Sequence, residues 1–320
     1  MIPRLPSNSR RRDFLTTSTV LAAGLYDSPK LLARKSQLFP GFETRKIRTP
    51  EVEIHAVTGG TGPPLLLLHG FPESHVSWHS IASRLAERFT VVIPDLRGYG
   101  DSGRPADGEN HAGYSKRVMA RDQVETMRSL GFDRFAVMGH DRGARVGWRL
   151  AVEQPQHVTR LAVLDIVPDH YSNVTREFAT AYFHWFFLIQ PAPFPEQLIA
   201  GNPEAFLHRF LPAKSIAPEA FAEYLRCLRD PQTIHAMCED YRAGASIDLA
   251  HEEETKGKKL QCPLLVLWGE RSVIARLSDV MQEWRGQASD IRGKALPAAH
   301  HLAEEAPEQT LTEVLSFLAS

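Results

Sequence analysis

Short apolar runs recur along the chain and predict the strands of a β-sheet. The run at 65–68 is apolar at every position, which is typical of a strand that is covered on both faces. Between the runs, residues 76–88 and 116–131 place apolar side chains at helical spacing. The expected strands are 52–57, 65–68, 90–93, 134–138, 161–164 and 264–268. This alternation predicts an α/β fold with a mostly parallel, doubly wound sheet.

A long segment between two of the expected strands lacks their pattern. Residues 170–258 are rich in aromatic residues and helix formers, and the segment is too long for an ordinary crossover. We expect it to form a helical cap that is inserted into a core made of residues 37–169 and 259–320. A cap that closes over a site excludes water and brings further side chains into contact with a substrate.

Residues 1–36 differ in character from the rest of the chain. Arg10, Arg11 and Arg12 precede a mildly apolar stretch, which is typical of a twin-arginine export leader. The apolar stretch is short and no clear small-residue cleavage site follows it, so a disordered extension is the alternative. We expect a periplasmic protein if the leader is functional and a cytoplasmic one otherwise.

The composition is that of a soluble globular protein, with 43% hydrophobic and 23% charged residues. The formal net charge of −1 gives no general attraction to nucleic acid or to anionic lipid. No apolar run approaches the ~20 residues that span a bilayer. Cys227, Cys238 and Cys262 form no CxxC pair, which argues against a zinc site or a disulfide framework. We therefore expect neither a nucleic-acid nor a membrane partner, while a homodimer stays open.

The most informative motif is the octapeptide GHDRGARV at 139–146, which follows an apolar strand and begins a helical pattern. Gly139, Asp141 and Gly143 form a frame typical of a nucleophile elbow, the sharp strand-to-helix turn that exposes a reactive side chain. Glycines suit this turn because they let the backbone pass close to its neighbours. An aspartate here attacks an electrophilic carbon and forms an ester that water then cleaves. The motif therefore favours dehalogenation or epoxide opening over acyl transfer.

Several further motifs accompany the elbow. They are HGFP at 69–72, DLRGYGDSG at 95–103, LAVLD at 161–165, HWFF at 184–187, QPAPFPE at 190–196, MCEDYRAGA at 237–245 and AHHLAEEAPEQT at 299–310. Together they make the chain resemble the α/β-hydrolase superfamily and, within it, the fluoroacetate/haloacetate dehalogenase family. The resemblance runs from about Leu38 to the C-terminus and implies an α/β-hydrolase fold.

A base that activates the hydrolytic water is expected in a loop after the last strand. His300 and His301 both lie in that region. The resemblance aligns His300 with the catalytic histidine of the family and His301 with a variable neighbour. The alternative is that His301 acts as the base and His300 only packs.

An acidic residue should orient the imidazole of this base. Many α/β hydrolases place it shortly after the penultimate strand, but here WGER at 268–271 is followed by Ser272. The resembling dehalogenases use the position of Asp165, at the end of an expected strand, where side chains point toward the ligand crevice. Glu270 is the fallback, and a helix cap is the alternative role for Asp165.

Two arginines, Arg142 and Arg145, follow Asp141 on the first turn of the expected helix. Cations at a helix N-terminus oppose its dipole at a cost of about 0.3–1 kcal/mol each, so we expect a further reason for their presence. A guanidinium group can hold a substrate carboxylate through two hydrogen bonds and so fix the carbon that Asp141 attacks. The alternative is an exposed or paired arginine on a solvated helix.

The backbone amides of Phe71 and Arg142 stand where an oxyanion hole is expected for ester hydrolysis. Fluoride is a poor leaving group, so a defluorinating site needs hydrogen-bond donors aimed at the developing charge. The resemblance assigns halide binding to His184, Trp185 and Tyr241, although spacing alone would predict that they pack in the core. Some relatives carry a further tryptophan near 211–215, which is absent from this sequence, so the preferred halide stays open.

Together these residues predict hydrolytic dehalogenation of a haloacetate to glycolate and halide, with a small haloacid as substrate and no metal or organic cofactor. One alternative is an epoxide hydrolase with the same Asp–His–Asp set. It needs cap tyrosines that protonate the epoxide oxygen, and Tyr241 is the single matched candidate. The alternative from another class is a protein that binds a small acid without turnover.

Overall fold

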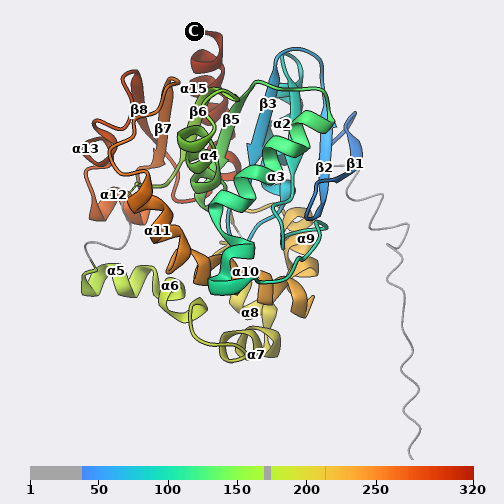
Figure 1. Ribbon diagram of the computed structural model, residues 1–320, viewed down its shortest axis with the longest axis vertical. Helices are drawn as coiled ribbons and strands as arrows, with labels where there is room; N and C mark the ends of the chain where they lie inside the picture. Colours follow the sequence, from blue (N-terminus) through green and yellow to red (C-terminus); the bar gives the residue numbers. More distant parts are fainter. Residues whose placement is uncertain (1–37, 169–173, 213) are drawn as a thin grey trace, which may run out of the picture.

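The computed structural model describes residues 38–168, 174–212 and 214–320 (Figure 1). The leader or extension expected at 1–36 lies outside these ranges. Within them, no helix is both long enough and apolar enough to cross a membrane.

The described strands form one eight-stranded sheet in the order β1-β2-β4-β3-β5-β6-β7-β8. Strand β2 pairs antiparallel with β1 and β4, and all other pairs are parallel. The strands are β1 (Glu43–Arg48), β2 (Glu53–Gly59), β3 (Pro64–Leu68), β4 (Thr90–Pro94), β5 (Phe135–His140), β6 (Val158–Leu164), β7 (Leu264–Gly269) and β8 (Ile291–Leu296). The mostly parallel, doubly wound sheet predicted from the apolar runs is therefore confirmed.

Every strand that the sequence predicts is present as one of β2 to β7. The sequence analysis missed the two edge strands, β1 and β8. Their sequences, ETRKIR and IRGKAL, leave most side chains partly or fully exposed. A strand with one neighbour and charged, exposed side chains lacks the apolar run that marks the central strands. A search for apolar runs therefore does not detect the edge strands β1 and β8.

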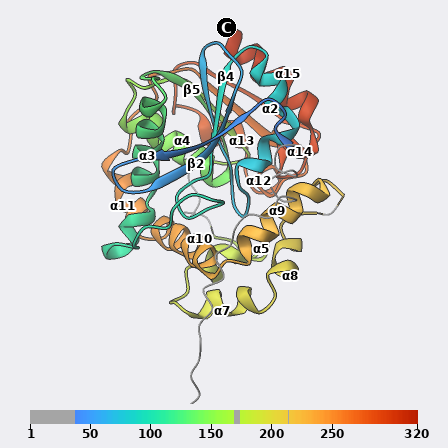
Figure 2. The same ribbon diagram turned by 90° about the vertical axis from the view of Figure 1, so that its right-hand side faces the viewer.

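Helices cover both faces of the sheet. Figure 2 shows α3 and α4 on one side of the strands and α2 and α15 on the other. The helices of this part of the chain are η1 (His75–Trp78), α2 (His79–Ala86), η2 (Glu109–Tyr114), α3 (Lys116–Ser129), α4 (Asp141–Glu153), α12 (Val273–Leu277), α13 (Val280–Trp284), α14 (Leu302–Glu305) and α15 (Pro307–Ala319). Covering both faces explains why the central strands are apolar at nearly every position.

The segment between β6 and β7 is helical, as its composition predicts. We call α5 to α11 the inserted helices: α5 (Arg176–Ala181), α6 (Phe183–Leu188), α7 (Phe194–Gly201), α8 (Pro203–His208), α9 (Pro218–Leu228), α10 (Pro231–Gly244) and α11 (Ile247–Glu254). Figure 1 shows α5 to α10 gathered at one end of the sheet. Trp185, Leu188 and Tyr224 from these helices belong to the same buried cluster as the strands. The division into a core and a separate cap domain stays a prediction.

Candidate active site

The turn between β5 and α4 places Asp141 in a left-handed backbone conformation, with φ of 45°. A Cβ atom on Gly139 would lie 2.6 Å from the backbone of Ala144, and one on Gly143 would lie 2.3 Å from the carbonyl oxygen of Leu68. Both distances are far below van der Waals contact, so only glycine fits at these two positions. The backbone thus has the tight geometry of a nucleophile elbow, with Asp141 at its apex.

Two backbone amides lie beside the Asp141 carboxylate. The N–H of Phe71, in the loop after β3, donates to Oδ2 of Asp141 at 3.1 Å. The amide of Arg142 belongs to the first turn of α4, where N–H groups have no partner within the helix. The N-terminus of α4, where the helix dipole favours negative charge, adds to this stabilisation of the carboxylate. The oxyanion hole formed by the amides of Phe71 and Arg142 stays a prediction.

The Asp141 side chain carries a negative charge at neutral pH. It is buried, with 8% of its surface exposed, and burial alone would raise its pKa. The positive charges of His300, His140 and Arg142 outweigh burial, and the pKa of Asp141 lies below its ordinary value. A carboxylate that stays ionised in a nearly dry environment is suited to attack an electrophilic carbon.

His300 and Asp165 form a hydrogen-bonded pair near Asp141. The Nδ1–H of His300 donates to Oδ2 of Asp165 at 2.6 Å, and the N–H of Gly269 donates to the other carboxylate oxygen at 3.0 Å. Burial is the largest single influence on His300 and lowers its pKa, but the hydrogen bond to Asp165 and the negative charges of Asp165 and Asp141 together outweigh it, so the net shift is upward. With Nδ1 engaged, Nε2 is the nitrogen left to take a proton from water. Glu270, the fallback acid, is exposed.

His301 has a different environment from its neighbour. Its Nδ1 lies 2.8 Å from Oε1 of Glu73, and its Nε2 lies 3.1 Å from the carbonyl oxygen of Phe210. Glu73 also lies 3.1 Å from Nδ1 of His140, so it links two buried imidazoles. Because both ring nitrogens of His301 contact acceptors, this side chain holds structure together. The geometry therefore favours His300 as the base.

The two predicted carboxylate-binding arginines point to different places. Arg142 is buried, and its Nε and Nη2 donate to the two carboxylate oxygens of Asp240 at 3.0 and 2.7 Å. Its guanidinium carbon also lies 4.3 Å from the ring centroid of Tyr241. A protein carboxylate thus occupies the fork of Arg142. Its predicted role toward a substrate would require that pair to open, and it stays a prediction.

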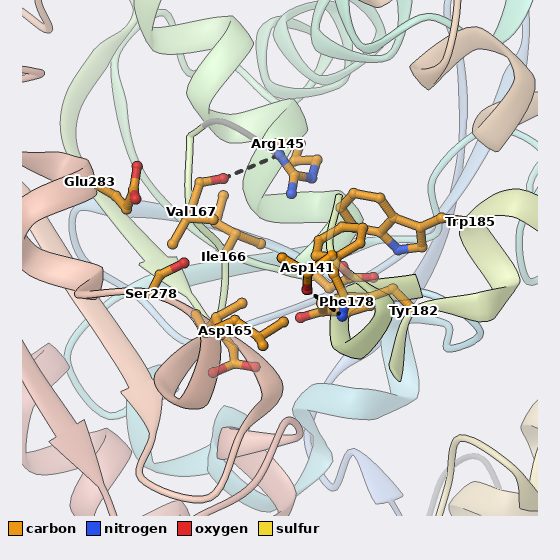
Figure 3. Close-up of a pocket in the computed structure, with 13 residues that line it drawn as sticks. Asp141, Arg145, Asp165, Ile166, Val167, Phe178, Tyr182, Trp185, Ser278 and Glu283 are labelled. Carbon is orange, nitrogen blue, oxygen red and sulfur yellow. Dashed lines mark hydrogen bonds between the residues drawn. The ribbon is translucent and has the colours of Figure 1, made fainter. Parts of the chain in front are cut away.

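Arg145 lies on the open side of α4. Its Nη1 donates to the carbonyl oxygen of Val167 at 3.3 Å, and its guanidinium lies 5.5 Å from the ring of Trp185. Figure 3 shows Arg145 beside the cavity that Asp141 and Asp165 also line. Of the two arginines, Arg145 is therefore the one placed to meet an anionic ligand.

Two adjacent cavities meet at Asp141. The larger, of about 290 Å³, is lined by Asp141, Arg145, Asp165, Ile166, Val167, Thr175, Phe178, Tyr182, Trp185, Ile274, Leu277, Ser278 and Glu283. The smaller, of about 140 Å³, is lined by Phe71, Asp141, Ala181, Tyr182, His184, Trp185, Arg209, Phe210, Val273, His300 and His301. The nucleophile and the base thus share the smaller cavity, and the nucleophile and Arg145 share the larger one.

The three predicted halide-binding residues are only partly together. His184 and Trp185, on α6, line the smaller cavity. Burial lowers the pKa of His184 to about 3, so its ring is neutral, and its Nδ1 has no hydrogen-bond partner in the described part of the chain. Tyr241 is 1% exposed and packs against Phe71 with ring centroids 5.0 Å apart. Tyr241 lines neither of these two cavities.

Sequence reasoning missed Tyr182, which lines both cavities. Burial raises its pKa, and the charges of Asp165 and Asp141 raise it further, so the phenol keeps its proton at neutral pH. A protonated phenol beside the nucleophile can donate a hydrogen bond. The available signal was its place two residues before His184, within one turn of the matched HWFF motif.

Residues 63–307 match the family model described as alpha/beta hydrolase fold. The chain is 43% identical over 290 residues to a fluoroacetate dehalogenase from Burkholderia sp., covering 88% of this chain and 95% of the relative. It is 33% identical to a soluble epoxide hydrolase from Corynebacterium sp., covering 83% and 93%. A solved structure of a protein assigned to the alpha/beta hydrolases, from Nostoc sp. PCC 7120, is 54% identical with a TM-score of 0.85, covering 87% and 98%.

Proposed function

Since the chain belongs to the α/β-hydrolase superfamily and, within it, to the dehalogenase family, we propose that it hydrolyses the carbon–halogen bond of a small haloacid. The products from a haloacetate would be glycolate and halide. The similarity to a fluoroacetate dehalogenase supports this choice, and the hydrolase fold is common to both families of relatives.

The single observation that carries the proposal is the setting of Asp141. Its ionised carboxylate lies at the junction of two cavities, with the cation of Arg145 in the larger one and His300, hydrogen-bonded to Asp165, in the smaller one. A substrate carboxylate held by Arg145 would direct the neighbouring halogen-bearing carbon toward Asp141. No other carboxylate lines both cavities.

In the first step, a carboxylate oxygen of Asp141 attacks the halogen-bearing carbon. A carbon–oxygen bond forms, the carbon–halogen bond breaks, and the halide leaves with the bonding electron pair. The polar hydrogens of His184 and Trp185, in the smaller cavity, would stabilise the developing negative charge. The product of this step is an ester between Asp141 and the acid.

In the second step, Nε2 of His300 takes a proton from water, and the resulting hydroxide attacks the carbonyl carbon of the Asp141 ester. The amides of Phe71 and Arg142 would stabilise the oxyanion of the tetrahedral intermediate. Its collapse passes the hydroxyl proton of the intermediate to the departing alkoxide oxygen, which releases the hydroxy acid and restores the carboxylate of Asp141. The imidazolium of His300 then returns its proton to solvent. Asp165 holds the charged imidazolium through the 2.6 Å hydrogen bond.

The direct test is halide release from chloroacetate and fluoroacetate by the purified protein. We expect release by the wild type and none by Asp141→Asn, whose amide is a poor nucleophile, while the exposed control Asp290→Asn stays active. A protein that only binds a small acid would release no halide from either substrate. That result would reject the proposal.

Epoxide hydrolysis is a second candidate because of Tyr182. This protonated phenol lines both cavities and would donate a hydrogen bond to the oxygen of an opening epoxide. The 33% identity to an epoxide hydrolase also supports it. Against it, the cation of Arg145 in the larger cavity suits an anionic substrate better than a neutral one.

Tyr182→Phe separates the two candidates. For a dehalogenase, the loss of the phenol should change halide release by less than about tenfold, the effect of one neutral hydrogen bond at most. For an epoxide hydrolase, it should lower diol formation from styrene oxide by the roughly 10²–10⁴-fold typical of a general acid. Diol formation without halide release would favour the second candidate.

A further inference from the structure

The larger cavity is bigger than a haloacetate needs. At the roughly 30 Å³ that one water-sized group occupies, a haloacetate of about five non-hydrogen atoms fills on the order of 150 Å³. The cavity measures about 290 Å³, and the halide has the adjacent cavity of about 140 Å³ available to it. A haloacetate therefore leaves a large part of this space unused.

The unused space has a largely apolar wall, which Thr175, Ser278 and Glu283 interrupt. Ile166 and Val167 follow β6, Ile274 and Leu277 come from α12, and Phe178 comes from α5. Three separate elements thus turn apolar side chains toward one volume. Figure 3 shows Phe178 beside Asp141 and the pair Ile166 and Val167 across from it. Such a wall favours an apolar group over bulk water.

The charged groups fix the direction in which a ligand would lie. Arg145 is the cation of the cavity, so a substrate carboxylate belongs at its end of the space. The halogen must face away from Asp141 for in-line attack, and the cavity of His184 receives it. The remaining substituent on the halogen-bearing carbon would then contact the apolar wall of the larger cavity.

We propose that the larger cavity is a subsite for an apolar substituent on the halogen-bearing carbon, and that the chain acts on 2-halo acids that carry an aryl or branched alkyl group. This inference rests on the proposed function, because the carboxylate and halide positions come from it. It adds the substrate class, which the similarity to a fluoroacetate dehalogenase does not supply.

Binding of halogen-free acids tests the subsite without any chemistry. In titration calorimetry with the full chain, phenylacetate should bind at least tenfold more tightly than acetate. Leu277→Trp, which fills the cavity from α12, should reduce this preference at least tenfold. The matched control Leu249→Trp, on α11 and 39% exposed, should keep it.

Equal affinities for the two acids would overturn the inference, and so would a preference that Leu277→Trp leaves intact. If circular dichroism shows that Leu277→Trp does not fold, Phe178→Trp fills the same cavity from α5. Halide release from chloroacetate, measured in parallel, tests the proposed function separately. Halide release without a preference for phenylacetate would reject the subsite alone. A phenylacetate preference without halide release from chloroacetate or 2-chloro-2-phenylacetate would retain the apolar pocket but overturn both the dehalogenase and the substrate class.

Discussion

Arg142 and Arg145 lie one turn apart on α4, yet they belong to different regions of the molecule. Behind Asp141, Arg142 joins Lys116, Asp240 and Asp248 in a group that we call the buried ion cluster. In front of Asp141, Arg145 lines the larger cavity. The buried ion cluster contains two cations and two anions, so its charges balance within the protein. The comparison teaches that two cations one turn apart on a helix can have different surroundings, Arg142 paired with a protein carboxylate and Arg145 beside a cavity.

The buried ion cluster holds the elbow to the inserted helices. Asp240 on α10 accepts from Arg142, and it accepts from the hydroxyl of Tyr99 at 2.7 Å. Burial would raise the pKa of Asp240, but Arg142 and Lys116 outweigh it and the pKa lies well below its ordinary value. The carboxylate is therefore charged in the folded protein and links α4 to α10. Arg145, in contrast, borders the larger cavity, which has room for a ligand.

Asp240→Asn should have the largest effect on stability. Removing this carboxylate leaves two buried cations, Arg142 and Lys116, with Asp248 as the remaining anion of the cluster, and breaking such a buried pair typically costs about 3–5 kcal/mol. Urea unfolding should report this loss, with Asp290→Asn as the exposed control. A change below about 1 kcal/mol would show that Asp240 does not stabilise the region behind Asp141.

Arg145→Gln should lower activity and leave stability nearly intact. Loss of a charged hydrogen bond of about 1.5–3 kcal/mol predicts a drop in kcat/KM for haloacids of roughly 10- to 100-fold. Turnover of the neutral chloroacetamide should fall much less, because it carries no carboxylate. The exposed Arg292→Gln on β8 is the control. An equal loss for both substrates would contradict carboxylate binding by Arg145.

The smallest of the expected effects is a shift in the pH dependence of kcat. The base acts only when His300 is neutral. Burial lowers its pKa, but the hydrogen bond to Asp165 and the charges of Asp165 and Asp141 together raise it above the ordinary value of about 6.5. The rate kcat should therefore fall as pH drops through this raised pKa. Asp165→Asn removes the raising charge, so the acid limb should move to lower pH as kcat decreases. An acid limb that stays in place would assign it to another group.

Local sequence patterns predicted the central strands of the sheet but not its edge strands. The central strands carry continuous apolar runs because helices cover both faces of the sheet. Strand β1 depends on pairing with β2, from Glu43 opposite Thr58 to Arg48 opposite Glu53, and its own residues are mostly exposed. Pairing between strands is a property of the assembled sheet, so the local sequence pattern could not predict β1 as a strand.

The site followed from sequence where the motif itself fixes the geometry. The glycines of the elbow are required by contacts within a few residues and with the neighbouring strand, so the position of Asp141 was predictable. The partner of Arg142 was not, because Asp240 is separated from it by 98 positions. Tyr182 was not predicted as a site residue because it lies in an aromatic stretch, where packing is the ordinary role of such a side chain.

The central claim is that Asp141 forms a covalent ester that water cleaves at the carboxyl carbon. Many turnovers of chloroacetate in water enriched in ¹⁸O, followed by mass spectrometry of the peptide that contains Asp141, test it most directly. The account predicts ¹⁸O in the Asp141 carboxylate, because each cycle replaces one of its oxygens with one from water. Label in glycolate from the first turnover, with an unlabelled Asp141 peptide, would contradict it and show that water attacks the substrate directly.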